Sequence, residues 1–335
     1  MVKGWAILGV TLIHSQALEG SLWMSLVFFH SVPVLIVVFG MNAEQWFRAR
    51  PPQGRVVAWY RRALRRIAVP VWATLALWWA MVLVLRPPFL QPTPRLLALH
   101  AVGIPRHVGT GWFIAVLVQL VVVFPLIRVC LERYGRRLLL VAALVVTAGL
   151  VAWEQDLRQL LGRASWTYLS PRFAAHVVFG SLLAERVGRR DFRFALLALA
   201  CLASLDLVAT TGALGPPWGR VADRLAELPL TVVLLVAAAA LARVDVAANA
   251  LGWLGRHSLG LYLGQLLTHD FFVFAFGGMC TIYGCRGGVY DVIDPWTYTA
   301  VLLVGSVLWM HLGNQALRWL AALRARGVPV PDLSV

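Results

Sequence analysis

Two ionisable residues, Lys3 and His14, lie eleven positions apart in the first apolar segment of the chain. In an α-helix eleven residues make about three turns, so the two side chains point to nearly the same face, about 16 Å apart along the axis. A neutral imidazole can take a proton from a hydroxyl group near neutral pH, which few other side chains can do. The spacing predicts His14 as a general base, with a structural histidine bonded to a neighbouring helix as the alternative.

A histidine base needs a partner that orients its ring, and two carboxylates are the predicted partners. Glu19 follows His14 by about one helical turn, and Glu154 lies at the outer end of a later apolar segment. Each also has a simpler interpretation, as a solvated residue outside the membrane. Both interpretations stay open.

Four arginines stand within six positions, Arg61, Arg62, Arg65 and Arg66. Guanidinium groups bind phosphate in bidentate fashion, so the cluster suits a phosphate-rich ligand. Lys3, expected at the same level, adds a further positive charge. Arginines also anchor helices at the cytoplasmic face, which explains any single member equally well. Four in six positions exceed what anchoring requires and favour a binding site.

Membrane helices must position these residues, because the composition excludes an ordinary soluble protein. Hydrophobic residues make up 60% of the 335 residues and charged residues only 13%. Apolar segments long enough to cross a bilayer recur along the whole chain, which predicts an all-α polytopic membrane protein with a single membrane domain, 1–335. The ten predicted transmembrane segments are 4–18, 22–46, 67–86, 111–130, 138–154, 171–186, 194–211, 227–243, 251–275 and 296–320.

Positive charge orients these segments. If both termini lie in the cytoplasm, 21 of the 30 basic residues fall on the cytoplasmic face, as the positive-inside rule requires. That topology places Cys280 and Cys285 on the outer, disulfide-permissive side, so a bridge between them is predicted, with two free thiols as the alternative. The net charge of +15 is explained by these loops, and no separate basic domain exists to bind nucleic acid.

Further motifs follow in order along the predicted helices. They are His30 with Pro33 and Gly40, the arginine cluster ending at Pro70, Trp112-Phe113, and Gly255-x-x-Ser258-Leu259 with Tyr262. With the Lys3–His14 spacing, they resemble the acyltransferase-3 family of integral membrane O-acyltransferases. Members of that family carry a basic residue, ten intervening positions and a His on the first helix. The resemblance covers most of the chain.

Several positions depart from the family pattern. The basic residue on the first helix is usually Arg and is Lys3 here, and His30 is displaced by one position from its Pro. Gln265 stands where the late motif often ends in His, with His269 and Asp270 one turn on.

The resemblance implies an enzyme that transfers an acyl group, commonly acetyl, from cytoplasmic acyl-CoA to a hydroxyl of a glycan or other acceptor. Lys3 and the arginine cluster would then bind the coenzyme, and His14 would be the base. The pocket residues would be His30, Trp112, Ser258 and Tyr262. Core packing explains Ser258 and Tyr262 equally well, and an interfacial aromatic belt explains Trp112.

No metal is expected, because no His-x-x-x-His or similar ligand spacing occurs. Ala-, Leu- and Arg-rich usage with a single Lys is typical of a bacterial protein, which would place the chain in an inner (cytoplasmic) membrane.

Two other functions stay open from the sequence. A proton-coupled secondary transporter or exporter of a glycan or lipid would use His14, Asp206 and Asp270 as a proton path. A catalytically inactive family member would serve as a scaffold or sensor, and the departures at Lys3 and Gln265 keep that alternative.

Overall fold

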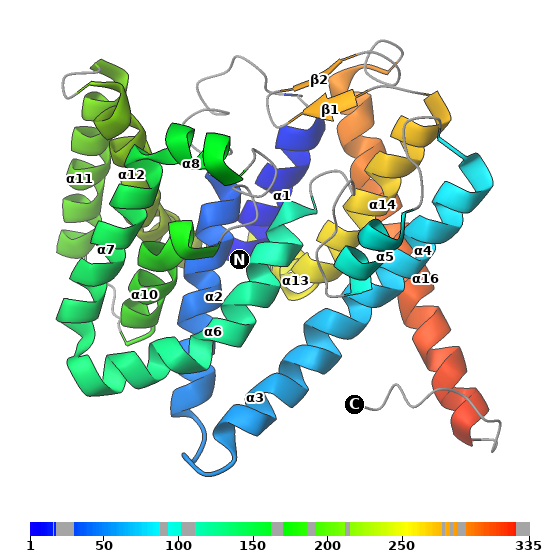
Figure 1. Ribbon diagram of the computed structural model, residues 1–335, viewed down its shortest axis with the longest axis horizontal. Coiled ribbons are helices and arrows are strands. Elements are labelled where there is room, and N and C mark those ends of the chain that lie inside the picture. The colour runs from blue at the N-terminus through cyan, green and yellow to red at the C-terminus, as the bar shows by residue number, and fades with distance from the viewer. Residues whose placement is uncertain are drawn as a thin grey trace. The chain divides into compact units, whose positions relative to one another are not determined.

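The structure is a computed structural model (Figure 1). It describes residues 1–15, 17, 30–87, 93–101, 111–161, 170–185, 192–211, 215–276, 279–281, 284–286 and 293–325. Glu19, one of the two predicted partners of His14, lies outside the described residues.

Helices make up most of the described chain. In chain order they are α1 (Val2–Ser15), α2 (Ser31–Arg48), α3 (Arg55–Ala63), α4 (Val69–Leu85), α5 (Pro94–Ala101), α6 (Trp112–Tyr134), α7 (Arg136–Ala152), α8 (Glu154–Leu161), α10 (Ala174–Leu183), α11 (Phe192–Thr211), α12 (Pro216–Leu241), α13 (Asp245–Arg256), α14 (Ser258–Phe276) and α16 (Pro295–Ala325). A π-helical segment, Leu64–Ala68, joins α3 to α4, and a 3₁₀ turn, Ser170–Phe173, precedes α10.

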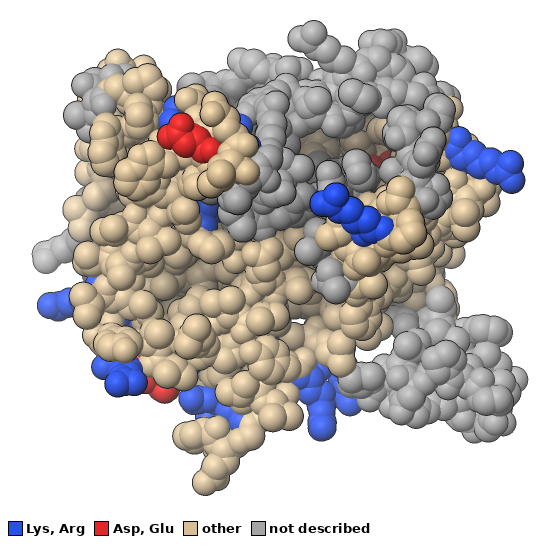
Figure 2. Space-filling model, in the orientation of Figure 1, with Lys and Arg blue, Asp and Glu red and all other residues tan. Residues whose placement is uncertain are grey.

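Among the described residues, four helical stretches are long and apolar enough to cross a membrane. They are Arg55–Leu85, Trp112–Tyr134, Pro216–Leu241 and Pro295–Gly313. A fifth span results if α7 and the first seven residues of α8, which meet at 68°, are counted together. Most of the described surface that Figure 2 shows is uncharged, as expected for helices that face lipid. The predicted helical, multi-pass membrane protein is thus confirmed, whereas the ten spans and the cytoplasmic position of both termini stay predictions.

Three predicted segments differ from the helices that form. The segment predicted at 67–86 continues a helix that starts at Arg55, because the arginine-rich stretch before it is also helical. The segment predicted at 227–243 starts at Pro216, since proline suits the first turn of a helix. The segment predicted at 251–275 is divided at His257 into α13 and α14.

The chain forms two compact units, each described here by itself. Unit 1 comprises Met1–Ala6, Ser25–Val56 and Gln119–Arg256, and unit 2 comprises Ile7–Met24, Val57–Val118 and His257–Val335.

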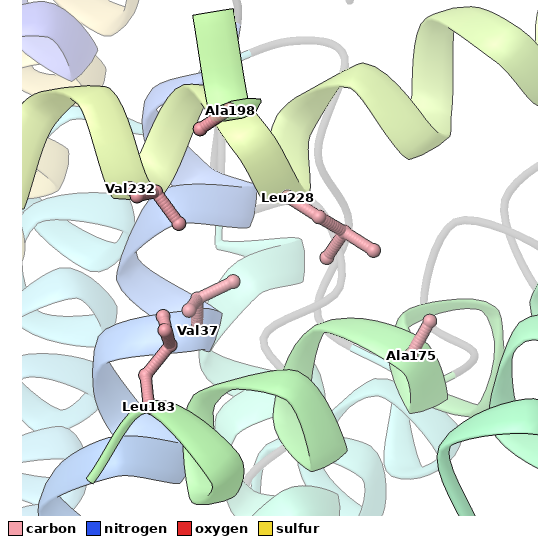
Figure 3. Packing of buried hydrophobic residues seen from close by; sticks show 6 residues of the cluster. All are labelled: Val37, Ala175, Leu183, Ala198, Leu228 and Val232. Carbon is pink, nitrogen blue, oxygen red and sulfur yellow. The ribbon is translucent and has the colours of Figure 1, made fainter. Parts of the chain in front are cut away.

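In unit 1, α2 packs along α10, and small residues let the two backbones approach closely. A Cβ added at Gly40 would lie 2.3 Å from the carbonyl oxygen of Val177, and one at Gly180 would lie 2.0 Å from that of Val37. Around this contact lies an apolar core to which α2, α10, α11 and α12 contribute (Figure 3). The core residues shown are Val37, Ala175, Leu183, Ala198, Leu228 and Val232.

In unit 2, α14 packs along α16 by the same device. A Cβ added at Gly264 would lie 2.6 Å from the carbonyl oxygen of Ser306, and one at Gly305 would lie 2.4 Å from the Thr268 hydroxyl oxygen. After α14 the strands β1 (Met279–Thr281) and β2 (Gly284–Arg286) pair antiparallel.

In the hairpin, Cys280 lies directly opposite Cys285 in the strand register. Opposite Cα atoms of such a pair are about 4.5–5.5 Å apart, within the range that a disulfide spans. The backbone thus suits the predicted bridge, although the side chains of both residues lie outside the described ones.

Candidate active site

The C-terminal end of α1 is anchored within unit 2 beside His14. Ser15 is fully buried, and its hydroxyl oxygen accepts a hydrogen bond from Thr299 of α16 at 2.6 Å. Ser15 donates in turn to the carbonyl oxygen of Leu12 at 3.2 Å. Because both bonds involve the residue next to His14, the backbone that carries the imidazole is held in place.

The partner of the His14 ring is Gln265 of α14. Nδ1 of His14 lies 2.6 Å from Nε2 of Gln265, and the Gln265 side chain is buried. Thr11, one turn before His14, lies 3.5 Å from Gln265 Oε1 through its hydroxyl oxygen. Among the described residues the ring is therefore oriented by a neutral amide; Glu19, one of the two carboxylates predicted for this role, lies outside them.

In the structure the amide nitrogen of Gln265 faces Nδ1 of His14 at 2.6 Å and the carbonyl oxygen of Val10 at 3.5 Å. The reversed orientation places the amide oxygen toward Nδ1 and the nitrogen toward Thr11. The Thr11 hydroxyl donates to the carbonyl oxygen of Ile7 at 3.0 Å, so its oxygen can accept a bond from the amide nitrogen. With the amide turned so, Gln265 Oε1 accepts the Nδ1–H of His14. The basic nitrogen of His14 is then Nε2, as a general base requires.

A second histidine lies beside the first. The imidazole centroids of His14 and His269 are 6.1 Å apart, and the rings meet edge to face. Nδ1 of His269 lies 3.2 Å from Oδ1 of Asp270, and the Asp270 Oδ2 accepts a hydrogen bond from the Trp78 indole at 2.7 Å. All three of His269, Asp270 and Trp78 are buried.

The arginine cluster lies in unit 2, on the continuous helix Arg55–Leu85. Arg61 and Arg62 end α3, and Arg65 and Arg66 lie in the π-helical segment. Three of the four are exposed and Arg62 is half-buried. No Asp or Glu occurs between Arg55 and Leu85, so no carboxylate on this helix competes for the arginines. Single π-helical turns are frequent at functional sites.

Lys3 lies in unit 1, on the first turn of α1 and against α13. A Cβ added at Gly255 would lie 3.4 Å from Cβ of Lys3, and one at Gly4 would lie 2.1 Å from the carbonyl oxygen of Leu251. At Gly255, in the motif Gly255-x-x-Ser258-Leu259, α13 therefore packs closely against the first residues of α1. This close approach explains the glycine in packing terms.

His30 belongs to a different cluster, in unit 1. Its Nδ1 lies 3.2 Å from Oε1 of Glu227, whose Oε2 lies 2.6 Å from Nε2 of His176. Arg224 donates to the same carboxylate at 2.6 Å. Glu227 and His176 are buried, so this carboxylate joins α12 to α10 and to the start of α2.

The remaining predicted site residues are placed as follows. Glu154 opens α8 in unit 1 and pairs with Arg158 one turn on. In unit 2 the buried Tyr262 ring packs edge to face on Phe113, at a centroid distance of 5.3 Å, and Trp112 contacts the same Phe113 at 6.3 Å. Ser258 is the first residue of α14 and is half-buried. Tyr262, Trp112 and Phe113 thus form one aromatic group.

Sequence reasoning missed three residues of these clusters as partners. Gln265 appeared only as a departure from a motif, and its contact with His14 spans 251 positions. Glu227 had a signal, an acidic residue before an apolar run, but stood at a predicted helix end. Trp78 was one of 15 tryptophans, with nothing in its sequence context to distinguish it.

Among the described residues, no group of three or more His, Cys, Asp or Glu is arranged to hold a metal ion.

Comparison with known proteins gives one match. The family model described as an acyltransferase domain matches residues 1–312, whereas no curated protein and no solved structure matches the chain. The match supports an enzyme over the transporter alternative. It covers His14, the arginine cluster and all of α14. The chain therefore belongs to the acyltransferase-3 family, and it is a multi-pass membrane acyltransferase.

Proposed function

We propose that this protein is an O-acyltransferase that moves an acyl group, acetyl in the first instance, from cytoplasmic acyl-CoA to a hydroxyl of a glycan or other acceptor. The observation that carries the proposal is the held imidazole of His14, 2.6 Å from Gln265 at the anchored end of α1. A general base must have a fixed ring with one nitrogen left for the substrate. Gln265 fixes the ring of His14. With its side-chain carbonyl toward Nδ1–H, it also leaves Nε2 for the substrate.

The reaction follows from that arrangement. Nε2 of His14 removes the proton of the acceptor hydroxyl while its oxygen attacks the thioester carbonyl carbon. A tetrahedral intermediate forms and collapses, breaking the carbon–sulfur bond. The departing sulfur takes up a proton, so the products are the O-acyl ester and the coenzyme thiol, and the net change moves one proton from the acceptor hydroxyl to the thiol. Positioned proton transfer of this kind contributes about 10²–10⁴-fold to rate.

The arginine cluster is the proposed donor site. Arg61, Arg65 and Arg66 are exposed and have no carboxylate on their own helix, which supports binding of the coenzyme phosphates. Lys3 is proposed to add charge at the same membrane face. His30, Trp112, Ser258 and Tyr262 remain proposed pocket residues, and Glu19 and Glu154 remain proposed carboxylate partners of the base.

The proposed topology has ten membrane helices in one domain with both termini in the cytoplasm of a bacterium. The charge asymmetry of the loops supports it, since 21 of 30 basic residues then face the cytoplasm. It places the arginine cluster on the side where acyl-CoA is found, and the proposed Cys280–Cys285 bridge on the outer side.

The test is transfer by the purified full-length protein in lipid. Acetyl-CoA and a mixture of glycan acceptors would be supplied to the wild type, to His14→Ala and to His311→Ala. His311 is an exposed histidine of unit 2 and serves as the matched control. We expect His14→Ala to lose about 10²–10⁴-fold in turnover while still binding coenzyme, and His311→Ala to match the wild type. Turnover that survives in His14→Ala would sink the proposed mechanism.

The donor site has its own test. Arg61→Gln combined with Arg65→Gln is expected to raise the KM for acetyl-CoA by about tenfold or more, because charge-assisted bonds to phosphate are each worth about 1.5–3 kcal/mol. Arg243→Gln, at an exposed arginine of unit 1, is the control. An unchanged KM in the double variant would assign the cluster to anchoring alone.

A further inference from the structure

Asp270 is a buried acidic residue that the reaction above does not use. The residue is 3% exposed and lies on the membrane helix α14. A carboxylate in such a place costs several kcal/mol unless donors satisfy it. Trp78 satisfies Oδ2 with an indole N–H at 2.7 Å, and His269 faces Oδ1 with Nδ1 at 3.2 Å. Asp270 therefore fixes the His269 ring, as the carboxylate of a catalytic dyad does.

The two neighbouring imidazoles have different partners. His14 is held by a neutral amide, whereas His269 faces the carboxyl group of Asp270, and the two imidazole centroids are 6.1 Å apart. The ring of Tyr298, from α16, also packs against His269 at a centroid distance of 6.5 Å. As a general rule a carboxylate beside an imidazole favours the ring that carries the extra proton, and an amide does not. Pairs of titratable groups in contrasting surroundings divide the roles of acid and base between them. The different partners of His14 and His269 are therefore the ground for assigning different roles to the two rings.

We propose that His269 is a second proton carrier of the transfer reaction, the general acid that protonates the leaving thiolate. The inference rests on the proposed function. The acceptor O–H gives its proton to Nε2 of His14, and the new carbon–oxygen bond forms. As the carbon–sulfur bond breaks, the electron pair goes to sulfur, which takes the proton from Nε2 of His269. His14 then carries a proton and His269 lacks one, so one proton moved between the two adjacent rings restores both.

Asp270 and Trp78 are positioning residues in this scheme. Asp270 holds Nδ1–H of His269 and stabilises the imidazolium, and Trp78 holds Asp270 from the neighbouring helix α4. The simpler assignment is a carboxylate that only joins α4 to α14. That assignment needs the Trp78–Asp270 bond alone, and gives the ring of His269 no part in proton transfer.

The pH dependence of turnover separates the two assignments. The full-length protein in lipid would be assayed with acetyl-CoA and the glycan mixture over a pH range wide enough to include both falls of the profile. The wild type is expected to give a bell-shaped profile, falling at low pH as the base takes a proton and at high pH as the acid loses one. His269→Gln keeps a hydrogen-bonding group near Asp270 but cannot act as an acid. It should lower the maximal rate by about 10²–10³-fold and abolish the alkaline fall.

Two further variants keep the test decisive if His269→Gln fails to fold. Asp270→Asn preserves shape and removes the charge, so the alkaline fall should move to lower pH while the acidic fall stays in place. Trp78→Phe loosens Asp270 and should shift the alkaline fall in the same direction by less. His311→Gln is the matched control and should leave the profile unchanged. Each folded variant would be accepted only if its coenzyme binding matches the wild type.

The outcomes separate failure of this inference from failure of the proposed function. In one outcome the wild type is active, His14→Ala is inactive, and His269→Gln and Asp270→Asn lower the rate equally at every pH. That outcome would overturn the role of His269 and leave His14 as the proposed base. If the wild type shows no transfer from acetyl-CoA to any acceptor, the proposed function falls and this inference with it. Loss of the alkaline fall in His269→Gln, with the fall retained in the His311→Gln control, supports the inference.

Discussion

The two units each hold a buried histidine cluster, and the clusters differ in how fully their partners are engaged. In unit 1 both oxygens of Glu227 are used, by His30, His176 and Arg224. In unit 2, within the part of the chain that the structure describes, the His14 ring lies against a neutral partner, Gln265, and a second ring, His269, lies at its edge. A carboxylate surrounded by donors from three segments holds helices together. A ring oriented through one nitrogen keeps the other for chemistry.

Removing the carboxylate of unit 1 is expected to have the largest effect on stability. Glu227→Ala leaves Arg224 and two histidines without their common partner, and breaking a buried charged network costs about 3–5 kcal/mol. The thermal unfolding midpoint of the detergent-purified protein should fall sharply. The control is Glu132→Ala, at a half-exposed carboxylate that pairs with Arg128, where the cost should be about 0–1 kcal/mol. Equal effects of the two substitutions would contradict the structural role of Glu227.

The helix contact that carries His30 and His176 gives the next prediction. Gly180→Ala puts a methyl group 2.0 Å from the carbonyl oxygen of Val37 and should destabilise unit 1 by about 1–3 kcal/mol. Gly149→Ala meets only the Trp153 side chain at 3.4 Å and should stabilise α7 by about 0.5–1 kcal/mol. The same substitution thus acts in opposite directions in one unit. Denaturant or thermal unfolding measures both, and matching signs would show that the close approach of α2 and α10 is absent.

Exchanging the partner of His14 sharpens the comparison directly. Gln265→Glu gives the ring of unit 2 a carboxylate like that of unit 1, which favours the protonated imidazole. The acidic fall of the pH–rate profile should then move to higher pH. Gln265→Leu removes the partner and should lower kcat by about 10–100-fold, as loss of an orienting neighbour does. A profile that Gln265→Glu leaves unmoved would mean that Gln265 does not hold the reacting ring.

The smallest predicted effect concerns the start of α16, which supplies Thr299 to the end of α1. Asp294 accepts hydrogen bonds from the backbone amides of Trp296 and Thr297, each at 3.0 Å. Bonds from Thr297, by side chain and backbone, and from Trp296 lower the pKa of Asp294 below its usual value. Its contribution is therefore present above the ordinary aspartate pKa and is lost as the pH falls through the lowered value.

Hydrogen exchange at the first turn of α16 measures this contribution. Protection, which is the slowing of exchange compared with an unstructured peptide at the same pH, should fall in the wild type below about pH 4. Asp294→Ala should show the reduced protection already at neutral pH. Exchange that is the same in both proteins at neutral pH would remove Asp294 as the cap.

Sequence alone was sufficient for the class of fold and for the helix that carries His14. Apolar length predicts membrane helices, and the Lys3–His14 spacing is a property of one helix. The partner of His14 is a property of two helices 251 positions apart, and no local pattern contains it. Glu154 illustrates the same limit, because its nearest cation, Arg158, was one turn away on a helix that was not predicted. Glu227, which contacts His30, His176 and Arg224, lies inside a predicted span only if α12 is known to begin at Pro216.

The π-helical segment Leu64–Ala68 has a consequence for how such a chain can change. A π-helical turn accommodates one residue more than an α-helical turn, with bonds from i to i+5. Deleting a single residue there would restore a continuous α-helix. The preceding helical residues would then be rotated by about 100° around the helix axis relative to α4. Arg61 and Arg62 would then face a new direction although no arginine had been replaced. At this helix an insertion or deletion, more than a substitution, can redirect the positive charge.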